Sequence, residues 1–187
     1  MTVRLAESGD LDVAARVLAE AFEEYPWTRW SIPDDGYAAR LEQIQRLYLS
    51  HALEHGLVVV DTRLRAVAAF LPPDAPAPSH RLQQQVAELH GARLAVTSEL
   101  SLPSPPAGAW TLETVGVDPA RQGSGLGTAV TAAGLAIIDD RADTIALETS
   151  LERNVALYQR LGFTTVATTA IPDGPVVYSM SRTSRSR

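Results

Sequence analysis

Residues 115–127 read Val-Gly-Val-Asp-Pro-Ala-Arg-Gln-Gly-Ser-Gly-Leu-Gly, and they decide the fold. An alternating apolar segment that starts at Trp110 leads into a turn at Pro119, and an apolar pattern of helical period follows the last glycine. Closely spaced glycines let backbone N–H groups turn toward a ligand. A helix that begins there adds its unpaired first-turn N–H groups and the positive end of its dipole. The stretch therefore predicts a binding loop for a diphosphate.

The glycine spacing narrows the kind of diphosphate. A P-loop requires Lys followed by Ser or Thr after its last glycine, and this chain contains no Lys. The dinucleotide fingerprint is G-x-G-x-x-G, whereas these glycines run G-x-G-x-G. The pattern Q-x-x-G-x-G resembles the signature of the GCN5-related N-acetyltransferase (GNAT) superfamily. The resemblance implies acetyl-CoA as cofactor, with its pyrophosphate bound by Gln122, Gly123, Ser124, Gly125, Leu126, Gly127 and Thr128.

A second segment, residues 147–163, strengthens the resemblance. Asn154 and Tyr158 are four residues apart, so a helix brings them to one face. Gly162 stands where a glycine commonly ends a helix. The segment resembles the second acetyl-CoA element of the superfamily, which implies that Asn154 contacts the pantetheine arm and that the Tyr158 hydroxyl lies near the thioester sulfur.

Shorter segments resemble the puromycin N-acetyltransferase subfamily. They occur in the same order and extend from about Thr2 to Met180: residues 2–6, 21–29, 109–117 and 171–175. This resemblance implies that the acceptor carries a primary amine beside an aromatic group. A protein N-terminus or a polyamine is the alternative acceptor, and a non-catalytic acyl-CoA-binding module is the alternative function.

The composition is that of an ordinary soluble globule, with 187 residues, 45% hydrophobic and 20% charged. We expect a single domain over residues 1–181 and a flexible basic tail over residues 182–187. The net charge of −6 argues against nucleic acid as a partner. Neither an 18-residue apolar run nor a signal-peptide pattern is found, so we expect a cytoplasmic protein without a membrane span. A monomer and a homodimer both remain open.

The chain contains no Cys, which excludes disulfides, thiolate metal ligands and an acetyl-cysteine intermediate. Acetyl transfer is therefore expected to be direct. His51-Ala-Leu-Glu54-His55 matches the H-x-x-E-H pattern of inverted zinc proteases. Because Gly56 ends the helix at once and no acidic third ligand stands out in the expected following helix, we predict two surface histidines and no metal site.

Periodicity predicts an order of strands and helices that resembles the GNAT fold. The resemblance implies an α/β fold with a mixed and mostly antiparallel sheet that is splayed at its central strand and flanked by helices. Strands are predicted at residues 3–5, 57–60, 66–71, 110–117, 144–149, 164–169 and 176–180. Helices are predicted at residues 11–22 with Asp10 as cap, 37–56, 81–100 with a break near Gly91, 126–137 and around Tyr158. Residues 25–36 are predicted to interrupt helicity.

Three residues are candidates for proton transfer. Tyr158 is the candidate general acid, since a phenol can protonate a departing thiolate. Glu113, predicted to share a strand face with Val115 and Val117, and Glu148 are the candidate bases. Each has a structural alternative: a packed aromatic for Tyr158 and a structural or solvent-facing carboxylate for Glu113 and Glu148.

Two further sets of candidates bind ligands. A splayed central strand would leave main-chain groups of Val115, Gly116 and Val117 free for the cofactor, whereas an ordinary strand would pair them in the sheet. The acceptor pocket is predicted to be lined by Tyr25, Trp27, Trp30 and Tyr37, because amphipathic aromatic side chains suit a flat, partly apolar ligand. The alternative is that these four side chains form a local core.

Overall fold

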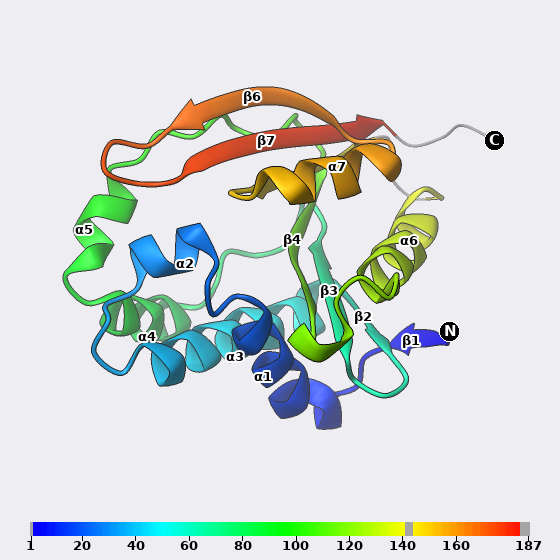
Figure 1. Cartoon of the computed structure of the whole chain (residues 1–187), viewed down its shortest axis with the longest axis horizontal. Helices are drawn as coiled ribbons and strands as arrows, with labels where there is room; N and C mark the ends of the chain where they lie inside the picture. Colours follow the sequence, from blue (N-terminus) through cyan, green and yellow to red (C-terminus); the bar gives the residue numbers. More distant parts are fainter. Residues whose placement is uncertain (1, 141–143, 184–187) are drawn as a thin grey trace.

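The computed structural model describes residues 2–140 and 144–183 (Figure 1). Within them lies one seven-stranded sheet in the order β1-β2-β3-β4-β5-β7-β6. All neighbouring strands are antiparallel except β4 and β5. The strands are β1 (Val3–Leu5), β2 (Leu57–Asp61), β3 (Ala66–Leu71), β4 (Trp110–Val117), β5 (Thr144–Thr149), β6 (Thr164–Ala170) and β7 (Val176–Thr183).

Helices cover both faces of the sheet. They are α1 (Leu11–Ala21), α2 (Pro26–Ser31), α3 (Tyr37–His55), α4 (His80–His90), α5 (Arg93–Ser98), α6 (Leu126–Ile138) and α7 (Glu152–Arg160). Gly91 separates α4 from α5, as predicted. None of the helices in the described part of the chain is both long and apolar enough to cross a membrane.

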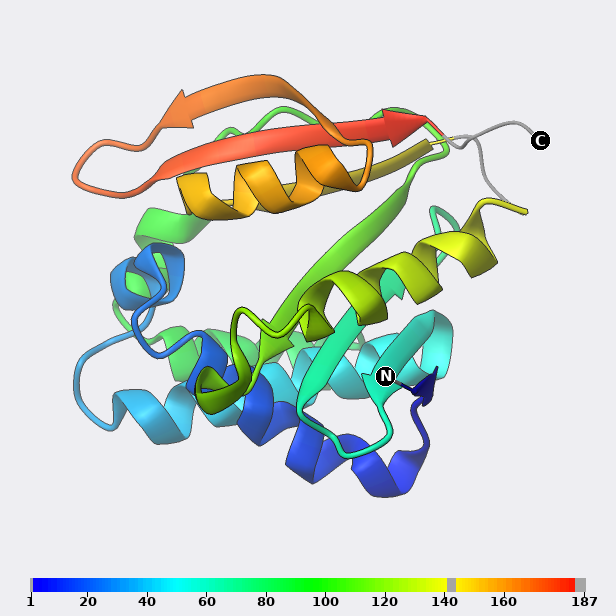
Figure 2. The ribbon, with the colours of Figure 1, turned by 45° about the vertical axis from the view of Figure 1, so that its right-hand side comes forward.

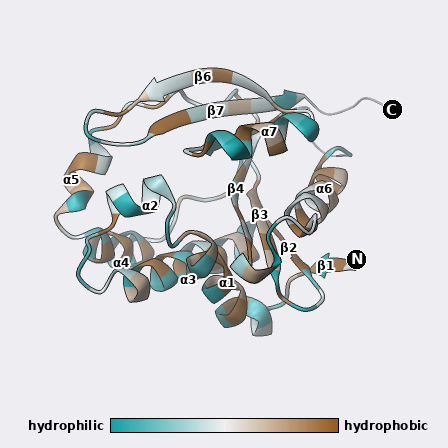
Figure 3. Ribbon diagram, in the orientation of Figure 1, coloured by the Kyte–Doolittle hydropathy of each residue, from teal (hydrophilic) through white to brown (hydrophobic). Residues whose placement is uncertain are grey.

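Alternation along β2 and β3 divides the apolar core into two layers. Val59, Ala68 and Phe70 face α6, whereas Val60 and Val67 face α1 and α3. This follows from the period of two in a strand, which sends neighbouring side chains to opposite faces. Hydrophobic residues, brown in Figure 3, accordingly run along β2 and β3 in the middle of the molecule.

The sheet opens between its two halves. The parallel strands β4 and β5 pair only at Trp110–Ile145 and Thr111–Ala146 in the described residues. Beyond these pairs the strands diverge, and Figure 2 shows β6 and β7 turned away from β3 and β4. The predicted splay at the central strand is therefore present.

Three local predictions are wrong. Residues 25–36 contain α2, because Pro26 occupies its first position, where a missing N–H costs nothing. Asp10 stands before α1 but does not cap it; its carboxylate accepts from Arg4 and from the Glu7 N–H instead. The helical period of residues 37–56 predicts Tyr48 on the buried side with Leu41, Ile44 and Ala52, but Tyr48 is 46% exposed.

The predicted tail begins too early. Strand β7 continues to Thr183, and Arg182 is buried, with its guanidinium donating to both carboxylate oxygens of Asp139 at 2.8 and 2.6 Å. Two parallel bonds to one carboxylate hold an arginine in a fixed orientation. The remainder of the predicted tail, residues 184–187, lies outside the described residues.

Candidate active site

The glycine loop leaves backbone donors unpaired at the start of α6. Gly123 and Gly125 have φ of 76° and 82°, a left-handed conformation that glycine adopts without strain. Among the described residues, no hydrogen bond uses the N–H groups of Gly123, Gly125, Leu126, Gly127 or Thr128. The loop is exposed at Gln122–Gly125. Its free donors and the helix dipole suit a phosphate ligand.

The diverging edge of β4 supplies a second set of main-chain groups. The Asp118 N–H donates to the Arg65 carbonyl at 2.8 Å, which marks a hydrogen-bonded position of the β3–β4 ladder. Because such positions alternate, the main-chain groups of Val115 and Val117 point away from β3, to the side where β5 has diverged. Gly116 pairs with Val67 of β3, so the structure does not bring its main chain to this gap.

Gly116 has a packing role instead. A Cβ at this position would lie 2.7 Å from Leu18 Cδ2, so α1 packs directly on the backbone of β4. The side chains of Val115 and Val117 point the other way, toward Gly127 of α6. The two valines thus keep the loop and the strand edge together.

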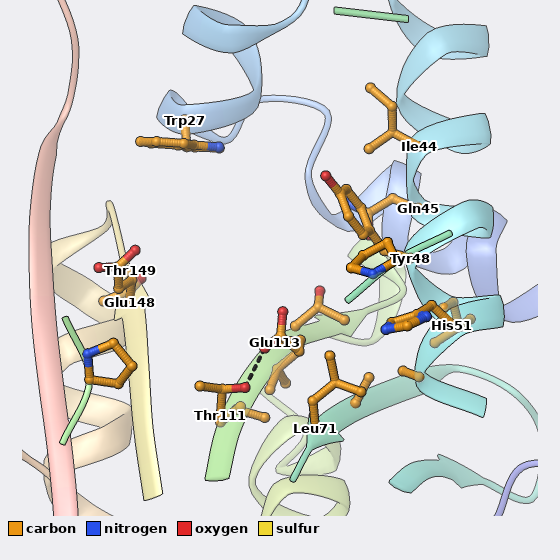
Figure 4. A pocket seen from close by; sticks show the side chains of 18 of the residues that line it. Trp27, Ile44, Gln45, Tyr48, His51, Leu71, Thr111, Glu113, Glu148 and Thr149 are labelled. Carbon is orange, nitrogen blue, oxygen red and sulfur yellow. Dashed lines mark hydrogen bonds between the residues drawn. The ribbon is translucent and has the colours of Figure 1, made fainter. Parts of the chain in front are cut away.

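A cleft of about 920 Å³ lies beside this edge (Figure 4). It is bounded by α2 and α3 on one side and by the ends of β5 and α7 on the other. The side chains of interest along it are Tyr25, Trp27, Tyr48, His51, Glu113, Glu148, Asn154 and Tyr158. Aromatic rings and two carboxylates therefore share one space.

Tyr158 is one of the residues that line this cleft. Its side chain is buried, and burial is the main reason that its pKa is raised above the ordinary value, with a smaller contribution from Tyr25. Among the described residues, no group hydrogen bonds to its hydroxyl. The phenol therefore keeps its proton through the neutral range and can donate it to a ligand. Asn154, one turn earlier, donates from Nδ2 to Thr149 Oγ1 at 3.2 Å.

Tyr25 connects the two walls of the cleft. Its hydroxyl accepts the Ser150 N–H at 2.6 Å and lies 3.1 Å from Thr149 Oγ1. The same Thr149 hydroxyl accepts from Asn154. A chain of hydrogen bonds thus joins the segment before α2 to the start of α7.

The four aromatic residues predicted for the acceptor pocket separate into two pairs. Tyr25 and Trp27 line the cleft, whereas Trp30 and Tyr37 do not. Tyr37 is buried, with its hydroxyl 3.0 Å from both the Glu23 carbonyl and Thr28 Oγ1. Trp30 packs against Gly174: a Cβ added at Gly174 would lie 3.0 Å from the Trp30 ring. Tyr37 belongs to a hydrophobic core cluster with Ile32, Leu41 and Ile44, whereas Trp30 is half-buried outside the cleft lining.

A β-bulge reverses the predicted orientation of Glu113. The β3–β4 register shifts between Ala69 and Phe70, so Glu113 is an extra residue without a partner on β3. As a result Leu112 and Val115 pack in the same core layer, and Glu113 lies on the opposite face. The bulge directs its carboxylate into the cleft, where Thr111 Oγ1 donates to it.

Glu148 lines the same cleft from β5. Partial burial raises the pKa of this carboxyl, a hydrogen bond from Ser179 lowers it, and the charge of Glu113 raises it further. The net shift is upward, toward the range in which a base works at neutral pH. The charge of one candidate base, Glu113, thus affects the protonation of the other.

The side of the cleft that α3 forms was not predicted from the sequence. His51, predicted to lie on the surface, is buried and lines the cleft together with Tyr48 (Figure 4). The spacing of Ile44, Tyr48 and His51 by four and three residues indicates one helical face and could have revealed this wall. Within the described residues, no three His, Asp or Glu side chains are grouped so that they could hold a metal ion.

The chain is similar to known acetyltransferases along most of its length. The model of the acetyltransferase (GNAT) family matches residues 19–163. A structure described as histone acetyltransferase HPA2 and related acetyltransferase, from Corynebacterium glutamicum, is 26% identical, with a TM-score of 0.76 and coverage of 100% of this chain and 97% of that one.

Two more distant structures share the fold. The ribosomal-protein-S18-alanine N-acetyltransferase of Escherichia coli has a TM-score of 0.56 at 18% identity. YncA of Salmonella typhimurium, solved with acetyl-CoA as its cofactor, has a TM-score of 0.57 at 18% identity. Each alignment covers 100% of this chain and 95% of the other.

Proposed function

The chain belongs to the acetyltransferase (GNAT) family, and from this premise we propose that it transfers the acetyl group of acetyl-CoA directly to a small molecule that carries a primary amine beside an aromatic group. A puromycin-like aminonucleoside is one such acceptor. GNAT acetyltransferases use acetyl-CoA. The observation that carries the proposal is a line of main-chain groups that, among the described residues, bond to no neighbouring strand or helix and lead from the start of α6 along β4 to the cleft containing Tyr158.

We assign the cofactor to this line of donors. The free N–H groups of Gly123, Gly125 and the first turn of α6 would bind its pyrophosphate. The main-chain groups of Val115 and Val117, with the Asn154 side chain, would bind its pantetheine arm. Bound there, acetyl-CoA would supply an activated acetyl thioester to the cleft.

The residues around the cleft would stabilise charge and transfer protons. Glu113 and Glu148 attract the cationic amine, and Glu113 accepts the proton that makes its nitrogen nucleophilic. The Val115 N–H donates to the carbonyl oxygen as negative charge develops on it. The Tyr158 hydroxyl donates its proton to the departing sulfur, a role supported by its free hydroxyl and by the burial that keeps it protonated.

The cleft lining supports the acceptor class. Trp27 and Tyr48 offer aromatic surfaces, and prolines at residues 72, 73, 76 and 78 make the neighbouring wall stiff and apolar. The two carboxylates enter the same space from different strands, Glu148 from β5 and Glu113 from β4 (Figure 4). A flat group would pack on an aromatic ring while its ammonium faces Glu113 or Glu148.

A thiol-release assay tests the proposal. Purified protein with acetyl-CoA would be offered three acceptor sets: small aromatic amines including puromycin, polyamines, and peptides with free N-termini. We expect turnover with at least one aromatic amine and weaker turnover with the other sets. A preference for peptides or polyamines would reassign the acceptor. Coenzyme A binding by calorimetry without turnover on any amine would instead indicate a non-catalytic module.

A further inference from the structure

His51 is a buried titratable group that the chemistry proposed above does not use. Its residue is 7% exposed and lines the cleft from α3. Among the described residues, no group hydrogen bonds to its imidazole. Neither ring nitrogen is among the buried polar atoms that lack a partner, so both keep some exposed surface. The ring nitrogens are therefore open to the space that Glu113 also faces (Figure 4).

His51 is connected to the protein surface along α3. One turn later, His55 places its ring centroid 4.7 Å from that of His51. The His55 side chain is 28% exposed, and its Nε2 lies 3.7 Å from a carboxylate oxygen of Glu54, which is 74% exposed. The H-x-x-E-H pattern thus forms a row of proton-carrying groups from the cleft to solvent.

Acetylation of an ammonium releases a proton that must leave the cleft. The ammonium loses two protons while the N–C bond forms and the C–S bond breaks. One of them ends on the coenzyme A sulfur through Tyr158, and the other must reach solvent. An ordinary carboxyl group holds a proton poorly at neutral pH, whereas an imidazole both accepts and releases one between pH 5 and 8.

We propose, on the basis of the acetyltransferase function above, that His51 takes the first proton of the ammonium from Glu113 and passes it through His55 to solvent. His55 packs beside His51 on α3. The other ionisable residues that line the same cleft are Tyr25, Tyr48, His90, Glu113, Glu148 and Tyr158. Glu113 lies near α3, since burial and then the charge of Glu113 raise the pKa of Tyr48 on that helix. His51 thereby determines which amines can be used, because it is needed for those that arrive charged.

The test compares two acceptors of different basicity. His51→Gln keeps a polar side chain of similar size but cannot titrate. For an alkyl ammonium acceptor at pH 7 we expect kcat/KM to fall by about 100-fold, the usual contribution of acid–base catalysis. For an aniline-type amine that is already neutral at pH 7, the same variant should approach the wild-type rate. The loss for the alkylamine should also shrink as pH rises and the free amine becomes neutral.

Controls separate this role from a structural one. His80→Gln changes an exposed position at the start of α4 and should leave kcat/KM unchanged for both acceptors. If His51 had a purely structural role, His51→Gln would lower kcat/KM for both acceptors by the same factor at every pH. That result would overturn the proposal. Identical profiles of wild type and His51→Gln would overturn it as well.

A second variant keeps the test decisive if His51→Gln does not fold. His55→Gln, nearer the surface, should give a smaller loss that is reversed by rising imidazole buffer concentration, because the buffer replaces the missing proton carrier. A rate that does not respond to buffer would exclude the exit through His55. Wild-type protein that releases no thiol with any amine would reject the acetyltransferase proposal itself, whereas active wild type with an unaffected variant rejects the relay alone.

Discussion

At the residue scale, the surroundings of Tyr158 suit the proton donation that we propose for it. Its ring packs against Phe163 at a centroid distance of 5.9 Å, and burial raises its pKa. Tyr158→Phe removes the proton and keeps the packing, so we expect kcat to fall by about 100-fold with little change in the KM for acetyl-CoA. Steady-state kinetics at saturating acceptor measures both constants. An unchanged kcat would remove Tyr158 from the mechanism.

Asp61 is the residue that organises the β2–β3 turn. Its buried carboxylate accepts from the backbone N–H groups of Arg65 and Ala66, and Arg65 Nη2 approaches it at 2.6 Å. Burial alone would raise the pKa of Asp61, but these hydrogen bonds outweigh it and the pKa is lowered. The stabilising contribution of Asp61 is therefore complete above the pKa of the unfolded chain and is lost as pH falls through the lower, folded pKa.

Asp61→Asn should consequently lower the free energy of unfolding by on the order of 2 kcal/mol at neutral pH, because it removes the charge and leaves hydrogen-bond donors poorly satisfied. The difference from wild type should shrink as pH falls below the ordinary carboxyl range, where the unfolded wild-type chain gains its proton first and the folded carboxyl follows. Urea unfolding at neutral and at acidic pH measures it, with exposed Asp74→Asn as control. A difference that is independent of pH would contradict this account.

At the scale of elements, the start of α6 depends on a left-handed residue. Gly125 precedes the helix with φ of 82°, and Gly36 precedes α3 with φ of 64°. Alanine at either position costs roughly 1–2 kcal/mol of backbone strain. Gly125→Ala should also shift the first-turn N–H groups and weaken coenzyme A binding about tenfold. Calorimetry should find normal affinity in Gly36→Ala, which carries similar strain away from the loop. Equal affinities in both variants would place the cofactor elsewhere.

At the scale of the whole molecule, Tyr25 joins the acceptor side to the cofactor side. Its hydroxyl holds Ser150 and Thr149, and Thr149 in turn holds Asn154. Tyr25→Phe should raise the KM values of acceptor and acetyl-CoA together, by about threefold to tenfold, because one net hydrogen bond is lost from a shared network. The same kinetics on Tyr178→Phe, a partly buried tyrosine of β7, provides the control. An effect on the acceptor alone would show that the two sides are independent.

Local patterns determined a large part of this molecule. The loop at residues 122–128, the pairing of Asn154 with Tyr158 on one helical face and the positions of the strands depend on neighbours within a few residues, since glycine conformations and helical spacing are local properties. Most elements were therefore predicted close to their bounds, and the GNAT fold was predicted from two short motifs.

Only the tertiary structure decided which side chains face the cleft and which distant residues they contact. The bulge that turns Glu113 into the cleft exists because β4 must match the register of β3, and no pattern within β4 shows it. Whether Tyr25, Tyr37 or His51 borders the cleft depends on which elements pack beside α2 and α3. Arg182 is fixed by Asp139, at the end of a helix far from it in sequence. Such outcomes arise from contacts between distant segments, so they become determined only when the chain is packed.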